Sequence, residues 1–406
     1  MKTYQMMHFP LEGAGTGIYV DSLANSLVKK EHHVKVLCSG HRLPHKSYPV
    51  DAVLFNNGEN KKFDLDFDFP VFASHSLSKG KKFGELSVAE RQAYFQAFQG
   101  KIESGLSAFS PDIVHVHHGW VIASILAEFE VPYVITLHGT EYYAFKDYKD
   151  YQEDVLRGLH GAEIVMALTE DERNRAIETY GLDPERITVI TSGTDINMFK
   201  PLEVDKEGLL RSYSIEAVDR PVVFFGGRLT VQKGVDTLLR AASTYSKTDE
   251  KPITLIAGDG NIRDDLEQLA AELKLDSVYF LGARSHEQMV KLFNVADIAA
   301  MPSIFEPFGL VAVEALACGT PVIAGDVGGF SRNVNNEIGY LLKPGDYKTL
   351  AEKVTAFIKE GFKGKIKDKA VAYVRRNFSW DKTVENIEKL YKQVLSCNGK
   401  GSDSSS

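Results

Sequence analysis

The sequence has few cysteines, no long apolar run and no excess of positive charge. Its three cysteines, Cys38, Cys318 and Cys397, are widely spaced and form no CxxC pair. This spacing argues against a disulfide framework and favours reduced, buried thiols. No window approaches the roughly 18 consecutive apolar residues of a membrane-spanning helix, and residues 1–13 lack the apolar core of a signal peptide. We therefore expect a cytoplasmic protein, and peripheral membrane contact stays open.

The charge balance disfavours one class of partner. Lysine and arginine number 47 against 55 aspartates and glutamates, which gives a formal net charge of −8. Nucleic-acid binding is usually accompanied by a basic excess, so we expect no nucleic-acid partner. The basic stretches 29–30 and 79–82 are explained more simply as solvated faces.

Apolar runs and amphipathic segments alternate along the 406 residues. This βαβα rhythm predicts parallel sheets covered by helices, and the length fits two domains. The first series of expected strands is 4–9, 34–38, 113–117, 133–137, 164–167 and 187–190, with helices at 17–30, 89–109 and 169–180. The second series of strands is 222–225, 254–257, 278–281, 298–301, 321–324 and 339–341, with helices at 234–246, 263–273, 287–294, 311–317 and 350–359.

The pattern breaks near residues 197–201, where a proline follows. We therefore expect a first domain over 1–199 and a second over 200–379. A closing helix over 380–397 returns to the first domain, and residues 398–406 have the composition of a disordered tail. In such sheets, ligands bind at the carboxyl ends of the strands, so the loops there are the candidates for chemistry.

The loop at residues 13–17 (GAGTG) follows the first strand and opens a helix. Its glycines would let an anion approach the backbone at the helix N-terminus, although a plain tight turn remains the alternative. The loop is not a strict GxGxxG pattern. The second strand also ends without an acidic residue for a ribose, so a nicotinamide dinucleotide is disfavoured.

Three histidines cluster at the end of the expected strand 113–117. His115 and His117 alternate and so share one face, whereas His118 points the other way. No carboxylate or cysteine stands nearby at ligand spacing, so we expect no metal. At least one of these histidines is expected in the core, and His117 is the best candidate to face a crevice.

Polar residues follow the next strand, and aromatic residues follow them. His138, Thr140 and Glu141 precede the aromatic stretch 142–145. This order suits a sugar or an aglycone, but aromatic residues are equally common in plain packing.

The loop at 226–234 carries two cationic side chains next to two glycines, which leave the backbone accessible. Arg228 offers a planar fork for phosphate oxygens, and Lys233 offers a point charge. The pattern indicates diphosphate binding, with a solvated basic turn as the alternative.

Two glutamates, Glu306 and Glu314, flank an expected strand–loop–helix junction. Residues 308–310 lie where the helix begins, so their N–H groups would be free to hold an anion. Glu314 lies one turn after Leu310 and can accept two hydrogen bonds from a ribose diol. Glu306 is placed to meet a hydroxyl-rich group on the other side of the phosphates.

Together, residues 306–314, 226–228 and Lys233 resemble the retaining glycosyltransferases of family four. Further matching stretches are 189–195, 199–201, 280–282, 296–298 and 378–380. The resemblance implies an α/β protein of the GT-B fold, with two Rossmann-like, doubly wound parallel-sheet domains facing across a cleft. It implies transfer of a sugar from a nucleotide diphosphate sugar, with UDP as the expected nucleotide, to a hydroxyl acceptor by front-side displacement. The acceptor is a small molecule, a glycan or a lipid-linked molecule, and no cofactor or metal is expected.

The resemblance also assigns roles. The expected catalytic residues are Arg228, Lys233, Glu306 and His117. The expected donor-binding residues are Gly15, Thr16, Gly17, Gly227, Phe308, Gly309, Leu310 and Glu314. The expected acceptor-side residues are His138, Thr140 and Glu141. Departures from the family pattern at Ser192 and at residues 331–332 affect the acceptor details rather than the core site.

Two alternatives remain. A nucleotide-sugar epimerase shares the fold and would act on its substrate without an acceptor. A non-catalytic nucleotide-binding module would be expected to lack Arg228, Lys233 or Glu306, and the sequence has all three.

Overall fold

The structure, a computed structural model, describes residues 1–12, 15–72, 80–306 and 308–399. The chain divides into two compact units. Unit 1 comprises residues 1–192 and the closing helix, and unit 2 comprises Gly193–Ser379. We expected the boundary at residue 199. The segment from Gly193 onward instead joins unit 2, where the backbone N–H of Thr194 donates to the carbonyl of Phe378.

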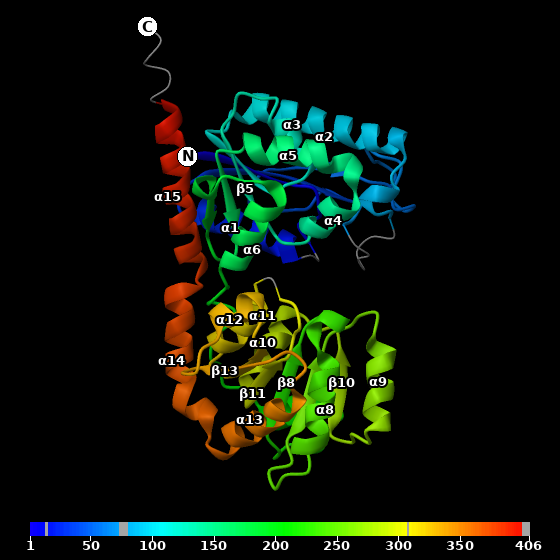
Figure 1. The fold of residues 1–406 in the computed structure, drawn as a ribbon, viewed down its shortest axis with the longest axis vertical. Coiled ribbons are helices and arrows are strands. Elements are labelled where there is room, and N and C mark those ends of the chain that lie inside the picture. Colours follow the sequence, from blue (N-terminus) through cyan, green and yellow to red (C-terminus); the bar gives the residue numbers. More distant parts are fainter. Residues whose placement is uncertain (13–14, 73–79, 307, 400–406) are drawn as a thin grey trace. The chain divides into compact units, whose positions relative to one another are not determined.

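Unit 1 is built on a seven-stranded parallel sheet of order β3-β2-β1-β4-β5-β6-β7. Figure 1 draws its elements in blue to green along residues 1–192. Its strands are β1 (Lys2–Met7), β2 (His33–Gly40), β3 (Val50–Leu54), β4 (Ile113–His117), β5 (Tyr133–Thr136), β6 (Ile164–Ala167) and β7 (Ile187–Val189). The order reverses between β1 and β4, so the carboxyl ends of these two strands flank the position where such folds bind ligands.

Helices cover both faces of this sheet. They are α1 (Gly15–Lys29), α2 (Val88–Phe109), α3 (Val121–Leu126), α4 (Glu141–Asp147), α5 (Gln152–Gly161), α6 (Glu170–Tyr180) and α15 (Trp380–Gly399), with short 3-10 turns η1 (Phe83–Glu85), η2 (Lys149–Tyr151) and η3 (Pro184–Arg186). Tyr19 of α1 and Tyr391 of α15 contact the face that carries His115 and His117. The alternate residues of β4, Val114 and Val116, belong to the apolar core on the other face.

Unit 2 has a six-stranded parallel sheet of order β10-β9-β8-β11-β12-β13. Its strands are β8 (Val222–Gly226), β9 (Ile253–Ala257), β10 (Val278–Gly282), β11 (Ile298–Met301), β12 (Val322–Gly325) and β13 (Gly339–Leu342). Its helices are α7 (Lys206–Ser212), α8 (Val235–Tyr245), α9 (Arg263–Glu272), α10 (His286–Val295), α11 (Leu310–Ala317), α12 (Gly328–Asn333), α13 (Tyr347–Lys359) and α14 (Phe362–Asn377), with the 3-10 turn η4 (Val231–Lys233).

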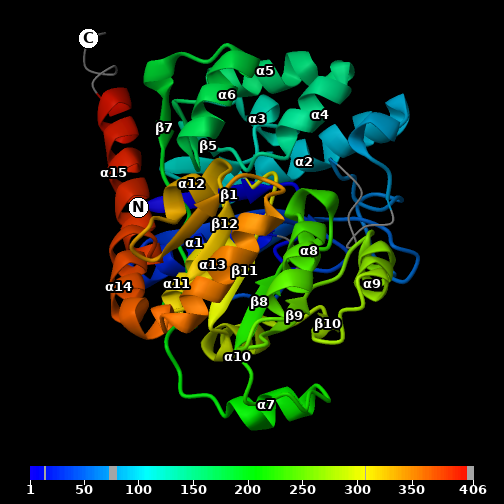
Figure 2. The ribbon, with the colours of Figure 1, turned by 60° about the horizontal axis from the view of Figure 1, so that its bottom comes forward.

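Two layers of helices enclose the second sheet. Helices α8 and α13 pack together against Phe225 on one face (Figure 2). The neighbouring residue, Phe224, points to the other face and contacts Phe293 of α10, with ring centroids 5.1 Å apart. The order of this sheet reverses between β8 and β11, which makes the carboxyl ends of these strands the ligand-binding edge.

Each of the expected strands is present, with ends shifted by no more than a few residues. The sequence prediction missed the edge strand β3 and the helices α3, α4, α5, α7, α12 and α14. Cys38 and Cys318 are buried free thiols as expected, but Cys397 is exposed, so that part of the prediction is wrong. Residues 398 and 399 belong to α15, and residues 400–406 of the expected tail lie outside the described residues.

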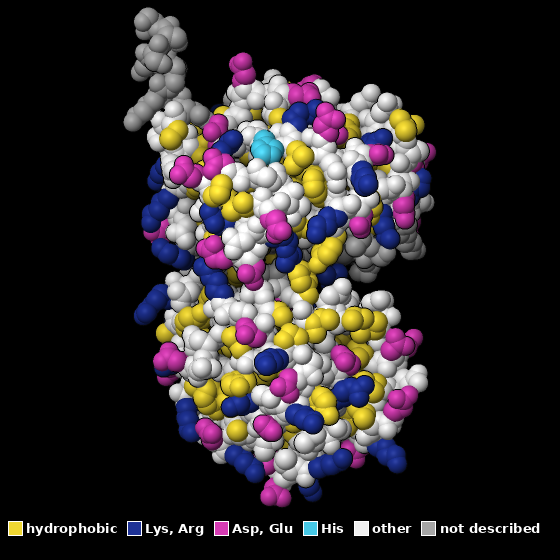
Figure 3. Space-filling view, viewed as in Figure 1, with side chains coloured by type: hydrophobic (Ala, Val, Ile, Leu, Met, Phe, Trp, Pro, Cys, Tyr) yellow, Lys and Arg dark blue, Asp and Glu magenta, His cyan; other side chains and the backbone are white. Residues whose placement is uncertain are grey.

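Acidic and basic side chains are interspersed on the face shown in Figure 3, and the described residues form no basic stripe there. None of the described helices is both long enough and apolar enough to cross a membrane.

Candidate active site

The loops after β8 and β11 meet at one point in unit 2. Gly234, between η4 and α8, has φ +63°, and a Cβ atom there would lie 2.1 Å from the carbonyl oxygen of Pro302. Only glycine fits this close approach between the two loops. The contact brings Nζ of Lys233 to 2.5 Å from Oε2 of Glu306, as a partly buried ion pair.

Backbone hydrogen bonds hold the glutamate's loop in place. The N–H of Ile304 donates to the carbonyl of Gln232 at 2.8 Å, and the N–H of Gly329 donates to the carbonyl of Glu306 at 3.0 Å. Glu306 is therefore anchored from both η4 and α12. Glu306 and Lys233 were each predicted as site residues, but nothing in the sequence indicated that they pair with one another.

Helix α11 begins beside this ion pair. Gly309 is its N-cap residue with φ +78°, and a Cβ atom there would lie 2.4 Å from the ring of Phe330. The backbone N–H groups of Phe308, Gly309 and Leu310 have no partner among the described residues. Unpaired N–H groups at a helix N-terminus attract an anion.

Glu314 lies one turn into α11. It is half-buried, and its carboxylate has no hydrogen-bond or ion-pair partner among the residues that the structure describes. Burial raises the pKa of Glu314 to about 8. The carboxyl group therefore has no partner within the described part of the chain and is available to hydrogen-bond a ligand.

Arg228 is the other cation of the predicted site. It is exposed, in the loop after β8, and no described carboxylate pairs with it. The preceding residue, Gly227, is fixed by a hydrogen bond from its N–H to the carbonyl of Ala257 at 3.0 Å. An unpaired guanidinium on a fixed turn is free to bind phosphate oxygens.

In unit 1, the end of β4 is linked to α1 and α4. His118 has φ +74°. Its Nδ1 lies 3.1 Å from Oε2 of Glu141, and its Nε2 lies 3.2 Å from the hydroxyl of Thr16. The Glu141 carboxylate also accepts from the backbone N–H of His138 at 2.9 Å.

Glu141 is fully buried and is therefore a structural anion of the site. Burial raises the pKa of Glu141, but the neighbouring His118 and the hydrogen bonds outweigh it, so the pKa lies below its usual value. Of the expected acceptor-side residues, Thr140 is exposed, whereas the next residue, Glu141, is buried. Gly15 is exposed and Gly17 is buried at the start of α1, while residues 13 and 14 lie outside the described residues.

His117 does not reach the surface of its unit, contrary to our expectation. It is fully buried, and its ring stacks on His115 with centroids 4.4 Å apart. Its Nε2 lies 3.1 Å from Oε1 of Gln5, and its Nδ1 lies 3.3 Å from Nε2 of His138. Burial lowers the pKa of His117 and of His138 well below the usual value, so both rings are neutral near pH 7.

The tautomers follow from these contacts. Oε1 of Gln5 can only accept, so Nε2 of His117 carries the proton and Nδ1 accepts from His138. Nδ1 of His138 is then a lone-pair nitrogen, with no partner among the described residues. Because His138 is half-buried, this nitrogen is available to a ligand, whereas His117, which we had expected to face a crevice, is enclosed.

Sequence reasoning missed three residues of this network. Gln5 supports His117, and the hydroxyl of Tyr391 lies 2.6 Å from Nδ1 of His115. His8 is buried, and neither of its ring nitrogens has a hydrogen-bond partner among the described residues. Polar residues inside an otherwise apolar strand are a signal that could have found Gln5 and His8. The position of Tyr391 depends on how α15 packs and has no local signal.

The sequence also matches two known protein families. Residues 210–379 match the family described as glycosyl transferases group 1, and residues 13–198 match the one described as glycosyltransferase family 4. The chain belongs to the family 4 glycosyltransferases. It is therefore an enzyme that transfers a sugar from a nucleotide sugar, as the sequence predicted.

The chain is also similar in sequence to individual glycosyltransferases. This glycosyltransferase is 27% identical over 410 residues to an uncharacterized glycosyltransferase of Methanocaldococcus jannaschii, covering 95% of this chain and 96% of that one. It is 33% identical over 304 residues to the D-inositol 3-phosphate glycosyltransferase of Mycobacterium tuberculosis, covering 70% of this chain but only 62% of the relative's length.

Two solved structures show the fold. Sucrose-phosphate synthase from Thermosynechococcus elongatus has a TM-score of 0.72 at 22% identity and covers 98% of this chain and 99% of that one. HepE from Anabaena, in complex with UDP and glucose, has a TM-score of 0.72 at 21% identity and covers 97% and 99% of the respective chains. The expected GT-B fold, with two Rossmann-like parallel-sheet domains, is confirmed.

Proposed function

We propose that unit 2 binds the nucleotide sugar through its diphosphate and that the sugar passes to an acceptor hydroxyl with retention of configuration. One observation carries this proposal. The Lys233 ammonium, the Arg228 guanidinium and the N–H groups at the start of α11 all lie in loops that follow β8 and β11, and the last two have no partner among the described residues. These are the donors that a diphosphate requires.

The pairing of Lys233 with Glu306 is compatible with this role. An ammonium has three N–H donors, and the ion pair uses one of them. The other two have no partner in the described part of the chain and can bind phosphate oxygens, while Glu306 fixes the direction of the side chain. The second carboxylate oxygen of Glu306 can accept a hydrogen bond from a sugar hydroxyl.

Glu314 is assigned to the ribose. Its partly buried carboxylate has no partner among the described residues, and it lies one turn from the proposed phosphate site. The two hydroxyls of a ribose can each donate to one of its oxygens.

We assign the acceptor side to unit 1, and Gly15, Thr16 and Gly17 at the start of α1 keep the donor-binding role that the family resemblance implies. His138 accepts a hydrogen bond from a substrate hydroxyl through Nδ1. The hydrogen bond between Nε2 of His138 and Nδ1 of His117 fixes the orientation of the His138 ring. Glu141 holds this arrangement through His118. UDP is the proposed nucleotide, because HepE, which has the same fold, was solved with UDP-glucose bound.

The proposed reaction takes place on one face of the sugar. The bond between the anomeric carbon and the diphosphate oxygen lengthens and breaks, and the electron pair stays on the diphosphate. Arg228, Lys233 and the α11 N-terminus stabilise that charge. The acceptor oxygen bonds to the same face of the anomeric carbon, and its proton passes to a departing phosphate oxygen.

A screen of donors tests this proposal. UDP-, GDP- and ADP-sugars are incubated with the enzyme, and release of nucleotide diphosphate is measured with and without EDTA. We expect slow hydrolysis of a UDP-sugar that EDTA does not abolish. Failure to turn over any nucleotide sugar contradicts the proposal. Proton NMR of the remaining sugar checks for epimerisation, which needs no acceptor.

A further inference from the structure

Unit 1 contains a pocket of about 520 Å³ whose lining residues are not among the site residues described above. We call it the β1–β3 pocket, because its walls follow the carboxyl ends of β1, β2 and β3. Its lining residues are Pro10, Leu11, Glu12, Ser39, Gly40, His41, Arg42, Pro44, Asn57, Glu59, Asn60 and Phe69. The edge of the sheet is the one that also carries His118.

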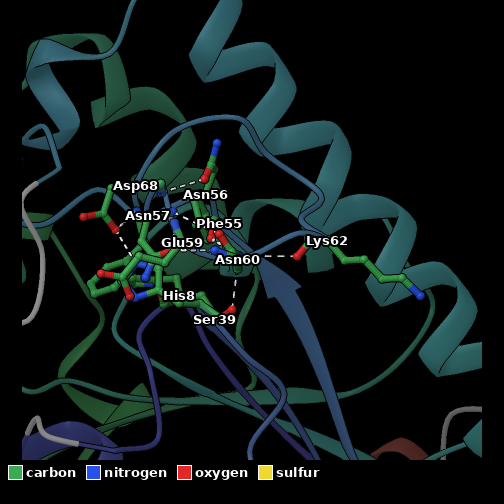
Figure 4. Close-up of polar contacts among 12 residues, drawn as sticks. His8, Ser39, Phe55, Asn56, Asn57, Glu59, Asn60, Lys62 and Asp68 are labelled. Carbon is green, nitrogen blue, oxygen red and sulfur yellow. Dashed lines mark hydrogen bonds and ion pairs between the residues drawn. The ribbon is translucent and has the colours of Figure 1, made fainter.

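The side chain of Asn60 links the walls of the pocket. The Nδ2 atom of Asn60 donates to the carbonyls of Phe55 and Lys62 at 2.9 and 3.3 Å (Figure 4). It also donates to the carbonyl of His41 at 3.2 Å. These bonds join the loop after β2 to the loop after β3. His41 is fixed further by Asp68, whose Oδ1 lies 2.5 Å from its Nε2. The pocket is thus preorganised.

Two polar groups of the same turn remain unused. Oδ1 of Asn57 accepts from the backbone N–H groups of Glu59 and Asn60, but its Nδ2 has no partner among the described residues. The carboxylate of Glu59 likewise has none within the described part of the chain. This exposed turn therefore carries one donor and one acceptor that are available to a ligand.

The charges of the lining disfavour an anionic ligand. Arg42 is its only arginine or lysine, and its guanidinium is paired with Glu12 at 3.0 Å. Glu59 adds a second carboxylate, so the acidic groups of the lining outnumber the basic ones. A phosphate group would meet more negative than positive charge there.

The rest of the lining suits the body of a sugar. Pro10, Leu11, Pro44 and the buried ring of Phe69 provide apolar surface. A sugar ring has C–H faces for such surface and hydroxyls for amide and carboxylate groups. We infer that the β1–β3 pocket binds the acceptor of the transfer through an uncharged, hydroxyl-rich glycosyl unit. This inference rests on the proposed function.

The test uses 4-nitrophenyl glycosides of glucose, galactose, mannose and N-acetylglucosamine, with glucose 6-phosphate and mannose 6-phosphate as charged probes. Release of nucleotide from the sugar donor that the wild type hydrolyses is the readout. We expect at least one uncharged glycoside to accelerate release saturably, with a lower KM than either sugar phosphate. The inference is overturned if none of the glycosides accelerates release, or if the sugar phosphates have the lower KM. In either case, hydrolysis of the donor by the wild type still supports the proposed function.

Two nearly isosteric variants locate the effect. Glu59→Gln removes the charge, and Asn57→Asp removes the free donor while keeping the oxygen that caps the turn. Each is expected to raise the acceptor KM about tenfold, the scale of one lost hydrogen bond, without changing donor hydrolysis. Arg91→Gln is the control, since Arg91 pairs with Asp150 in a separate hollow lined by helical residues. Equal KM values in the wild type and both pocket variants overturn the assignment.

Discussion

Lys233 and Glu306 form an ion pair, with Nζ and Oε2 2.5 Å apart, although 73 residues separate them in the sequence. The pair exists because Gly234 lets the loop after β8 approach the carbonyl of Pro302 in the loop after β11. The ammonium keeps a fixed direction and two donors that no described residue binds. It is thus oriented before any ligand arrives, which is what electrostatic stabilisation of a leaving group requires.

The first prediction concerns the two cations. Lys233→Ala and Arg228→Ala are each expected to lower turnover about a hundredfold or more, the scale of one lost preorganised charge stabiliser. The exposed Lys247→Ala should leave turnover unchanged. Initial rates at saturating donor measure the effect, and wild-type rates in both site variants would contradict the assigned diphosphate site.

The second prediction concerns the proton on Glu314. Its pKa of about 8 means that the carboxyl is mostly protonated at pH 7. Two hydrogen bonds from a ribose favour the charged form and lower the pKa. Binding of UDP at pH 7 should therefore release a fraction of a proton.

Calorimetry in buffers of different ionisation enthalpy measures this release. The Glu314→Gln variant should bind UDP more weakly and release no proton from this site. Proton release of the same size in the wild type and the variant would show that Glu314 does not meet the nucleotide.

The alternation of apolar runs and helices was enough to predict both sheets. Continuous apolar segments such as Ile298–Met301 are buried on both faces, and their sequence shows it. The edge strand Val50–Leu54 was missed because it is not such a run. It carries Asp51, which pairs with Lys35 at the sheet edge. Helix α14 was missed because its sequence contains Gly364 and many charges.

The candidate site could be predicted only in part, because its geometry depends on distant loops. Arg228, Lys233 and Glu314 could be proposed from local spacing. The burial of His117 could not, because it depends on Tyr19 and His138 from other elements. The hydrogen bonds of Asn60 to three carbonyls also appear only once the loops after β2 and β3 are packed.

The third prediction concerns the stability of unit 1 in acid. Burial lowers the pKa of His115 to about 3 and that of His8 well below its usual value. The unfolded chain binds protons at these groups below about pH 6.5, whereas the folded unit does not. Their contribution to stability is complete above that pH and is lost as the pH falls towards the folded pKa values.

A variant that lacks one of these buried histidines checks this prediction. The ring of His8 makes no hydrogen bond within the described residues, and it contacts the rings of Phe9, Phe72 and Phe83. His8→Phe should therefore shrink the fall in Tm between pH 7.5 and pH 5. The exposed His45→Gln should leave that fall unchanged, and an undiminished fall in His8→Phe would count against the histidine mechanism.

The fourth prediction separates two costs at the start of α11. Gly309 has φ +78°, and a Cβ atom there would lie 2.4 Å from the ring of Phe330. Gly345 has φ +79°, with nothing within 4 Å of the added atom. Both alanine variants incur the left-handed backbone cost of roughly 1–2 kcal/mol, but only Gly309→Ala also displaces the aromatic ring, at a further cost of about 1–3 kcal/mol.

Denaturant unfolding should therefore show Gly309→Ala to be the less stable of the two. The displaced N-cap also disturbs the N–H groups that we assign to the phosphates, so Gly309→Ala should bind UDP more weakly while Gly345→Ala binds it as the wild type does. Equal stability in the two variants would mean that Phe330 moves aside without cost. Equal UDP affinity would mean that the start of α11 does not hold the diphosphate, because a helix N-terminus binds an anion only through N–H groups that point at it.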